Sequence, residues 1–189
     1  MSRLLDQYKK EIIPALKGEF DYKNPMQVPK LEKVVVSIGV GSAVSDSKRL
    51  EIASESLAKI TGQKGIVTKA KNSIAGFKLR EGMPIGVKVT LRGEMMYEFV
   101  DRLVAIVLPR VRDFRGIDPN GFDKHGNYNL GLREHSVFPE ISFEDLSLTH
   151  GVQITIVTTA KTDDEGIKLL ELMGFPFKGI KVREGAHNG

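Results

Sequence analysis

Four histidines are the residues in this sequence that could most readily support catalysis or metal binding. They are His125, His135, His150 and His187, and no two of them stand at the spacing of a metal-binding pair. Most fall in expected loops or in the tail, where a solvated imidazole is the ordinary state. The chain has no cysteine, which excludes disulfides and thiolate chemistry, and no serine lies in a Gly-x-Ser-x-Gly turn. We therefore predict no catalytic residue, no metal and no cofactor.

A glycine-rich turn, Gly39-Val40-Gly41, lies between an expected strand and an expected helix. A dinucleotide-binding loop at such a place needs a third glycine and a helix that opens directly on the phosphates. Val44 stands at the third-glycine position, and Lys59 occupies the region where an acid would bind ribose. Two interpretations remain. The turn needs glycine torsion angles, or its bare backbone lets an RNA phosphate or ribose come close.

The charge of the chain is divided along its length. The formal net charge of the 189 residues is +4. Residues 64–92 carry seven basic side chains and one acid, whereas residues 134–171 carry eight acids and two lysines. A domain polarised in this way can face an anion with one surface and a basic partner with another. The alternative is two solvated faces.

No segment of the sequence is typical of a membrane protein or of a secreted one. No apolar run reaches the roughly 20 residues that a membrane helix needs, and residues 1–10 lack the apolar stretch of a signal peptide. We expect a cytoplasmic protein with no membrane partner.

Hydrophobic spacing predicts one α+β domain over residues 1–178, with a mostly antiparallel sheet and helices packed on one face. A flexible tail is expected at residues 179–189. The expected strands span residues 31–40, 65–69, 85–92, 128–132 and 152–159. The expected helices span about 2–17, 47–60, 94–108 and 162–173. Their expected boundaries and breaks are Ser2, Pro14, Ser45 or Asp46, Gly62, Pro109, the capping box Thr162-x-x-Glu165, Gly174 and Pro176.

The strand expected at residues 85–92 has the clearest pattern. Its apolar residues alternate with a second face that carries Lys88, Thr90 and Arg92. A cation, a hydroxyl and a guanidinium suit phosphate and ribose 2′-hydroxyl groups, whereas a merely solvated face would more often mix Glu with Lys. Phe77 is the one aromatic residue nearby. We therefore expect recognition of the shape and backbone of folded RNA more than base stacking.

The segment from Ala70 to Pro84 connects two expected strands and is long for a hairpin. Hairpin loops typically have about 2–5 residues, and much longer connections are usually functional or disordered. Gly76 and Gly82 permit bends, and Ile74 and Phe77 offer apolar surface. The charged residues are Lys71, Lys78 and Arg80 against Glu81. We predict a protruding basic loop.

From Tyr8 to about Phe177 the sequence resembles the bacterial L-five family of large-subunit ribosomal proteins. The matching segments are collinear: residues 26–33, 39–41, 61–64, 68–80, 82–94, 110–116, 126–131, 138–141 and 158–165. The family usually has Asn where this chain has Ser37, and Asp-Gly-Arg-Gly where it has residues 123–126. Residues 179–189 extend past the usual end.

The resemblance implies a structural protein of the central protuberance that binds 5S rRNA, with 23S rRNA nearby. Together with the residue patterns, it predicts 5S rRNA contacts at Lys30, Lys33, Ser37, Gly39, Gly41, Gln63, Lys64, Lys88, Thr90 and Arg92. It implies a P-site tRNA contact at Lys71, Asn72, Ser73, Ile74, Phe77, Lys78 and Arg80.

The resemblance also implies a third surface, an inter-subunit bridge to a basic protein of the small-subunit head. The predicted residues are Arg110, Arg112, Phe114, Arg115, Glu140 and Glu144. The alternative for the acids is a solvated loop. Two rival functions differ in what they require. An enzyme of nucleotide metabolism is disfavoured, because it would need a phosphate loop or an acid–base pair. A free-standing RNA chaperone or regulator remains an alternative, because it would use the same basic surface.

Overall fold

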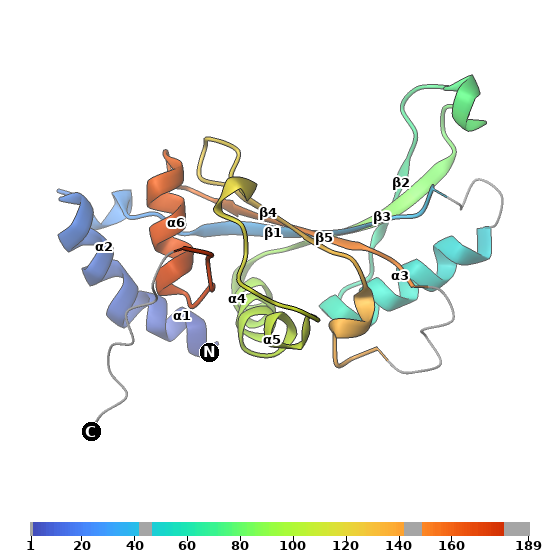
Figure 1. The fold of residues 1–189 in the computed structure, drawn as a ribbon. Helices are drawn as coiled ribbons and strands as arrows, with labels where there is room; N and C mark the ends of the chain where they lie inside the picture. The colour runs from blue at the N-terminus through green and yellow to red at the C-terminus, as the bar shows by residue number, and fades with distance from the viewer. Residues whose placement is uncertain (1, 42–46, 142–148, 180–189) are drawn as a thin grey trace.

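The computed structural model describes residues 2–41, 47–141 and 149–179. In this part the chain forms a five-stranded antiparallel sheet in the order β2-β3-β1-β5-β4, with helices packed on one face (Figure 1). The strands are β1 (Leu31–Gly39), β2 (Ile66–Lys69), β3 (Pro84–Leu91), β4 (Tyr128–Leu132) and β5 (Val152–Thr158). The predicted α+β class and the predicted strands are confirmed.

The central strand β1 shows why the sheet has one buried face. Val34, Val36 and Ile38 are at most 1% exposed. Their partners on β3 and β5 are also apolar and buried, because antiparallel pairing puts directly opposed residues on the same face. The covered face is therefore apolar across β3, β1 and β5. The other face is called the open face below.

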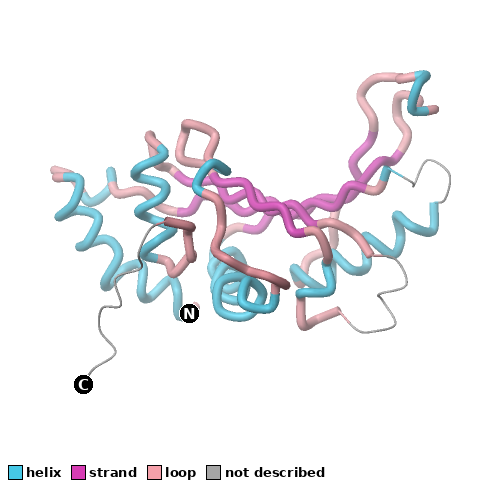
Figure 2. The backbone as a smooth tube through the Cα atoms, in the orientation of Figure 1, coloured by secondary structure: helices cyan, strands magenta, loops and turns pink. Residues whose placement is uncertain are grey.

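Two long helical stretches cover the sheet. α3 (Ser47–Thr61) contacts β3 and β1, and α4 (Gly93–Arg102) contacts β1 and α1 (Arg3–Gln7). The buried side chains of these helices include Leu57, Ile60 and Phe99. α2 (Ile13–Phe20) and α6 (Asp163–Leu172) contact each other beyond one end of the sheet (Figure 2).

Two helical stretches, α1 to α2 and α4 to α5 (Leu108–Arg110), continue past a proline. The sequence predicted a break or kink at Pro14 and a helix end at Pro109. Pro14 follows a π-helical segment, Tyr8–Ile12, and the helix continues to Phe20. Pro109 follows a second π-helical segment, Leu103–Val107, and the helix continues through α5. Proline lacks an N–H and crowds the carbonyl one turn earlier, and a widened turn accommodates both effects.

Helix ends show where the predicted caps form. Ser2 occupies the N-cap position of α1, but its side chain makes no capping bond there. Thr162 caps α6, because its Oγ1 accepts from the Glu165 N–H at 3.4 Å, and the Glu165 carboxylate accepts from the Lys161 N–H at 2.8 Å. Gly174 ends this region in the left-handed conformation, at φ +93°. Ser45, Asp46 and residues 180–189 lie outside the described residues.

Candidate nucleic-acid interface

The open face is built from rows of residues that run across the strands. The first row is Ile66 on β2, Lys88 on β3, Ser37 on β1, Gln153 on β5 and Gly131 on β4. The second row is Thr90 on β3, Val35 on β1, Thr155 on β5 and Asn129 on β4. Apart from Ile66, each residue stands next to at least one buried neighbour along its own strand, so the core fixes the position of both rows on β3, β1, β5 and β4.

The predicted 5S rRNA residues fall in two groups on this surface. Lys88, Thr90 and Ser37 lie at the centre of the rows, and Gly39 follows on β1. A Cβ added to Gly39 would meet nothing within 4 Å, so the space above this glycine is open. The peripheral residues are exposed or half-buried: Lys30 and Lys33 at the start of β1, Arg92 after β3, Gln63 and Lys64 before β2, and Gly41 after β1. Hence the prediction places its residues on β1, β2 and β3 or beside them.

Local contacts shape two of these peripheral positions. Lys33 Nζ lies 3.8 Å from the carboxylate of Glu32, and both side chains are partly exposed. Such a pair contributes little to stability and leaves the lysine available to a partner. The Lys30 backbone N–H donates to Thr159 Oγ1 at 3.0 Å, which fixes the entry to β1.

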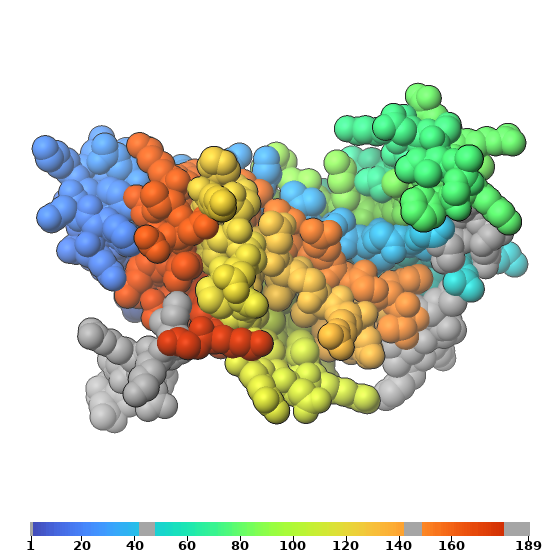
Figure 3. Space-filling view, turned by 45° about the horizontal axis from the view of Figure 1, so that its top comes forward, coloured from blue at the N-terminus to red at the C-terminus, as the bar shows by residue number. Residues whose placement is uncertain are grey.

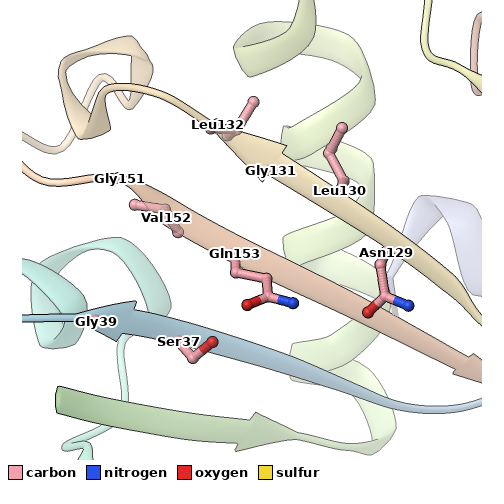
Figure 4. Close-up of a pocket in the computed structure, with 9 residues that line it drawn as sticks. All are labelled: Ser37, Gly39, Asn129, Leu130, Gly131, Leu132, Gly151, Val152 and Gln153. Carbon is pink, nitrogen blue, oxygen red and sulfur yellow. The ribbon is translucent and has the colours of Figure 1, made fainter. Parts of the chain in front are cut away.

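The β4–β5 half of the open face is a feature that the sequence prediction missed. Neither strand carries a charged residue. Gln153 and Asn129 are exposed, and Figure 4 shows the Gln153 amide between the Ser37 hydroxyl and the Asn129 amide. A shallow hollow of about 380 Å³ lies here, lined by Ser37, Gly39, residues 129–132 and residues 151–153.

The open face lies between two raised parts of the molecule. The loop between β2 and β3 projects from one end (green), and residues 118–126 with α6 stand at the other end (yellow and orange-red) in Figure 3. Side chains of β1 and β5 form the lower surface between them. A partner that reaches the sheet must therefore enter between these two parts.

The loop from Ala70 to Pro84 is a hydrogen-bonded hairpin extension. At its base, the Ala70 N–H donates to the Met83 carbonyl at 2.8 Å. Near its tip, Ile74 and Leu79 exchange two backbone bonds of 2.9 and 3.1 Å around a short 3-10 turn. The Glu81 N–H donates to Ser73 Oγ at 2.9 Å. The predicted protruding loop is confirmed, and these bonds define its conformation.

The predicted tRNA-contact residues are all exposed on this hairpin. Phe77 is 76% exposed and Ile74 is 45% exposed. The other exposed members are Lys71, Asn72, Ser73, Lys78 and Arg80. Gly82 takes a positive φ, as a bend requires, but the bend at the tip falls on Lys78 (φ +52°) and not on Gly76. Gly76 lies within the 3-10 turn Ala75–Phe77, so the chain bends at this glycine without needing a positive φ there.

Two of the predicted bridge residues, Arg110 and Arg112, line a second cleft, of about 570 Å³. Its lining consists of residues 110–113, 131–134, 136 and 137. Arg110, Arg112 and Arg115 are exposed, whereas the Phe114 ring packs against the core. Glu144 lies outside the described residues. In the described part of the chain, this surface carries more arginines than free acids.

Glu140 differs from the other predicted bridge residues because its carboxylate has an internal partner. It pairs with Arg102 of α4, and the same guanidinium donates to the Ile60 carbonyl at 3.3 Å. Glu140 therefore ties the segment after β4 to the helices beneath the sheet. Among the acids of residues 134–141, this leaves Glu134 as the exposed one, with its carboxylate accepting from Ser136 Oγ at 3.1 Å.

The expectation that the loop histidines are solvated is wrong for His135. Its side chain is 0% exposed, and its Nδ1 accepts from the His150 N–H at 3.1 Å. The His135 N–H donates in turn to the His150 carbonyl at 3.0 Å, and the two rings lie 5.6 Å apart. Burial, His135 and the positive charge of Arg49 lower the pKa of His150 below its usual value. These contacts hold His135 and His150 next to each other, although 15 positions separate them in the sequence.

Among the described residues, no group of three or more His, Asp or Glu side chains could hold a metal ion. No helix in the same part of the chain is long and apolar enough to cross a membrane.

Comparison with known proteins defines the class first: this is a ribosomal protein. The family described as "Ribosomal protein L5" matches residues 24–80, and "ribosomal L5P family C-terminus" matches residues 84–177. The large ribosomal subunit protein uL5 of Thermoanaerobacter sp. (strain X514) is 60% identical over 177 residues, which cover 94% of this chain and 99% of that protein. The uL5 protein of Rubrobacter xylanophilus is 58% identical over 178 residues, with the same coverages.

The chain belongs to the uL5 family of large ribosomal subunit proteins. It is therefore a structural constituent of the large subunit and not an enzyme. The sequence resemblance to the L-five family is confirmed.

Proposed function

We propose that this protein binds 5S rRNA through the open face and helps attach it, beside 23S rRNA, in the central protuberance. The observation that carries the proposal is the pairing of Lys88 with Ser37 and of Thr90 with Val35 on strands whose other face is the core. A cation and two hydroxyls are thereby held at fixed spacing on a surface open to a large partner. Lysine suits a phosphate, and a hydroxyl can both donate to and accept from a ribose 2′-hydroxyl.

Cationic residues around these rows enlarge the surface that can contact RNA phosphates. Lys64 lies before β2 and Arg92 lies after β3, both exposed. Lys33 stands at the far end of β1. Contacts to phosphates provide affinity and position but little sequence information. We therefore expect the shape of a folded RNA, together with its phosphates, to be recognised.

The hairpin extension is proposed to contact P-site tRNA. Its tip carries the exposed ring of Phe77 between Lys71, Lys78 and Arg80. It rises from one end of the sheet on the side of the open face, and its tip stands beyond the strands (Figure 1), so that one RNA can occupy the sheet and another the hairpin tip. The contact is proposed at the tRNA backbone, because every tRNA must be accepted there.

The third proposed contact is the bridge to a basic protein of the small-subunit head. In the described residues its acidic contribution rests on Glu134, since Glu140 is paired with Arg102. Arg110 and Arg112 line the same cleft as Glu134. Glu134 would form a salt-sensitive ion pair with the basic head protein, and the two arginines would donate hydrogen bonds to the same protein.

The 5S rRNA proposal is tested by titrating the full chain with 5S rRNA at several salt concentrations. A structured RNA of equal length and unrelated sequence is the matched control. We expect 5S rRNA to bind more tightly at every salt concentration, with a salt dependence that reports several phosphate contacts. Equal affinity for both RNAs would contradict the proposal, because it would show a basic surface without preference for 5S rRNA.

A further inference from the structure

The uncharged half of the open face continues the surface proposed for 5S rRNA. Ser37 on β1 pairs with Lys88 on one side and with Gln153 on the other, and Gln153 pairs with Gly131. Lys88 and Gly131 are therefore three strand spacings apart, roughly 14 Å. Along this row the side chains change from a cation to a hydroxyl, then to an amide, and then to bare backbone.

The amides of this half are arranged to receive a polar partner. Thr155 Oγ1 donates to Asn129 Oδ1 at 2.7 Å, which orients the Asn129 amide and leaves its two N–H donors for another acceptor. Gln153 is exposed, and no hydrogen bond of its side chain appears within the described part of the chain. Both amides therefore retain hydrogen-bonding capacity at the surface.

Glycines make this half approachable by a backbone or a sugar. A Cβ added to Gly131 or Gly39 would meet nothing within 4 Å. The two glycines border the hollow of about 380 Å³ that Gln153 and Asn129 also line (Figure 4). A hollow lined by neutral donors and acceptors, with no charged residue on β4 or β5, is poorly suited to a phosphate. It is well suited to hydroxyls and base edges.

The geometry points to a division of labour on one RNA. The β2–β3 side, with Lys88 and Arg92, holds phosphates, and the β4–β5 side, through Gln153 and Asn129, hydrogen-bonds 2′-hydroxyls and base edges of the shallow minor groove. A-form RNA displays both groups on that groove. The inference rests on the proposed binding of 5S rRNA and adds an orientation: the minor groove of the bound helix lies over β4 and β5.

The test uses the full chain, 5S rRNA and the substitutions Gln153→Ala and Asn129→Ala, singly and together. Gln7→Ala is the matched control, since Gln7 lies on α1 away from the open face. We expect each amide substitution to weaken binding roughly 2- to 10-fold, on the scale of a neutral hydrogen bond. The salt dependence should stay unchanged, because no phosphate contact is lost. The control should bind like the original protein.

A second measurement separates a direct contact from a loss of shape. The nucleotides protected by the protein are replaced by their 2′-deoxy forms. This replacement should weaken binding to the original protein and have a smaller effect on the Gln153→Ala variant, since the contact is already missing. Gln153 makes no internal bond in the described chain, so its variant should unfold at the original temperature.

Two failures can be told apart. If the original protein does not prefer 5S rRNA, or if changing Lys88 and Arg92 has no effect, the proposed function fails and this inference fails with it. If those results are as proposed but the amide variants bind normally, only this inference is overturned. It is also overturned if a protein, and not RNA, covers β4 and β5. A flattened salt dependence in the amide variants would also overturn it, because it would assign phosphates to this half.

Discussion

The open face and the hairpin extension carry similar side chains but hold them by different means. Lys88 lies between Val87 and Val89, which are buried in the core, and its strand is bonded on both sides. Phe77 and Lys78 lie on a hairpin held by its own backbone bonds between Ile74 and Leu79. The geometry of the face thus depends on the whole domain, whereas that of the hairpin depends on its own turn. The two surfaces should therefore be separable by mutation.

The largest effect is expected on RNA binding when Lys88 and Arg92 are both replaced by alanine. Both side chains are exposed, so the fold should be unaffected. Affinity for 5S rRNA should fall by about 1–3 kcal/mol per lost charged contact. The salt slope should flatten by about 0.7–0.9 per lost phosphate contact. Isothermal titration or filter binding measures both, and unchanged affinity in a folded variant would refute the assignment.

The substitution Leu91→Ala tests the opposite face of the same strand. Leu91 is 0% exposed and pairs with Val34. Its truncation should lower the free energy of unfolding by about 2–5 kcal/mol. Below the unfolding transition, 5S rRNA affinity should remain near that of the original protein. Normal stability with a large loss of RNA affinity would show that the two faces are not independent.

Deleting residues 72–79 and closing the gap with a short turn tests the separation of hairpin and face. The Ala70–Met83 bond at the base provides the point of closure. We expect 5S rRNA affinity to change less than about twofold, since the hairpin tip contributes no buried core residue. P-site tRNA retention, measured in assembled ribosomes, should fall. Loss of 5S rRNA binding with normal tRNA retention would show that the roles assigned to the hairpin and the open face are reversed.

A smaller effect is expected from Glu134→Lys at the proposed bridge. Glu134 is exposed, so its reversal changes charge without removing an internal ion pair. Glu140→Lys is a less clean test because it would also break the pair with Arg102. Subunit joining, followed by light scattering, should slow most at low salt. Identical rates at all salt and magnesium concentrations would favour a solvated surface.

The smallest effect concerns His150, the half-buried partner of the buried His135. Because the pKa of His150 is lowered in the folded protein, the unfolded chain binds this proton more readily. The free energy of unfolding should therefore decrease as pH falls below about 6.5, and the His150 contribution should be absent above that range. The decrease between pH 7.5 and 5.5 should be smaller in His150→Gln. An equal decrease in both proteins would show that His150 does not contribute to the pH dependence of stability.

The strand β3 could be predicted from the sequence because its alternation directly records one buried and one open face. The long hairpin could be predicted as well, since its length and exposed apolar residues are local features. The π-helical segments before Pro14 and Pro109, and the continuation of the helix past Pro109, could not, because a π turn depends on packing around the proline.

Other features depend on contacts between distant residues. His135 and His150 are 15 positions apart and meet only when the segment between them closes. Gln153 and Asn129 share a surface through the pairing of β5 with β4, which no local pattern specifies. Their strands also lack charge, so a search for basic residues passes over them. The cationic half of the candidate site was therefore predictable, and the amide half required the sheet.

Footprinting of 5S rRNA with hydroxyl radicals tests the central claim most directly. The original protein, the Lys88→Ala/Arg92→Ala variant and the hairpin deletion are compared at concentrations where the original protein saturates the RNA. The account predicts one protected region with the original protein, the same region with the hairpin deletion, and little protection with the double variant. Protection that survives in the double variant but disappears with the hairpin deletion would contradict it.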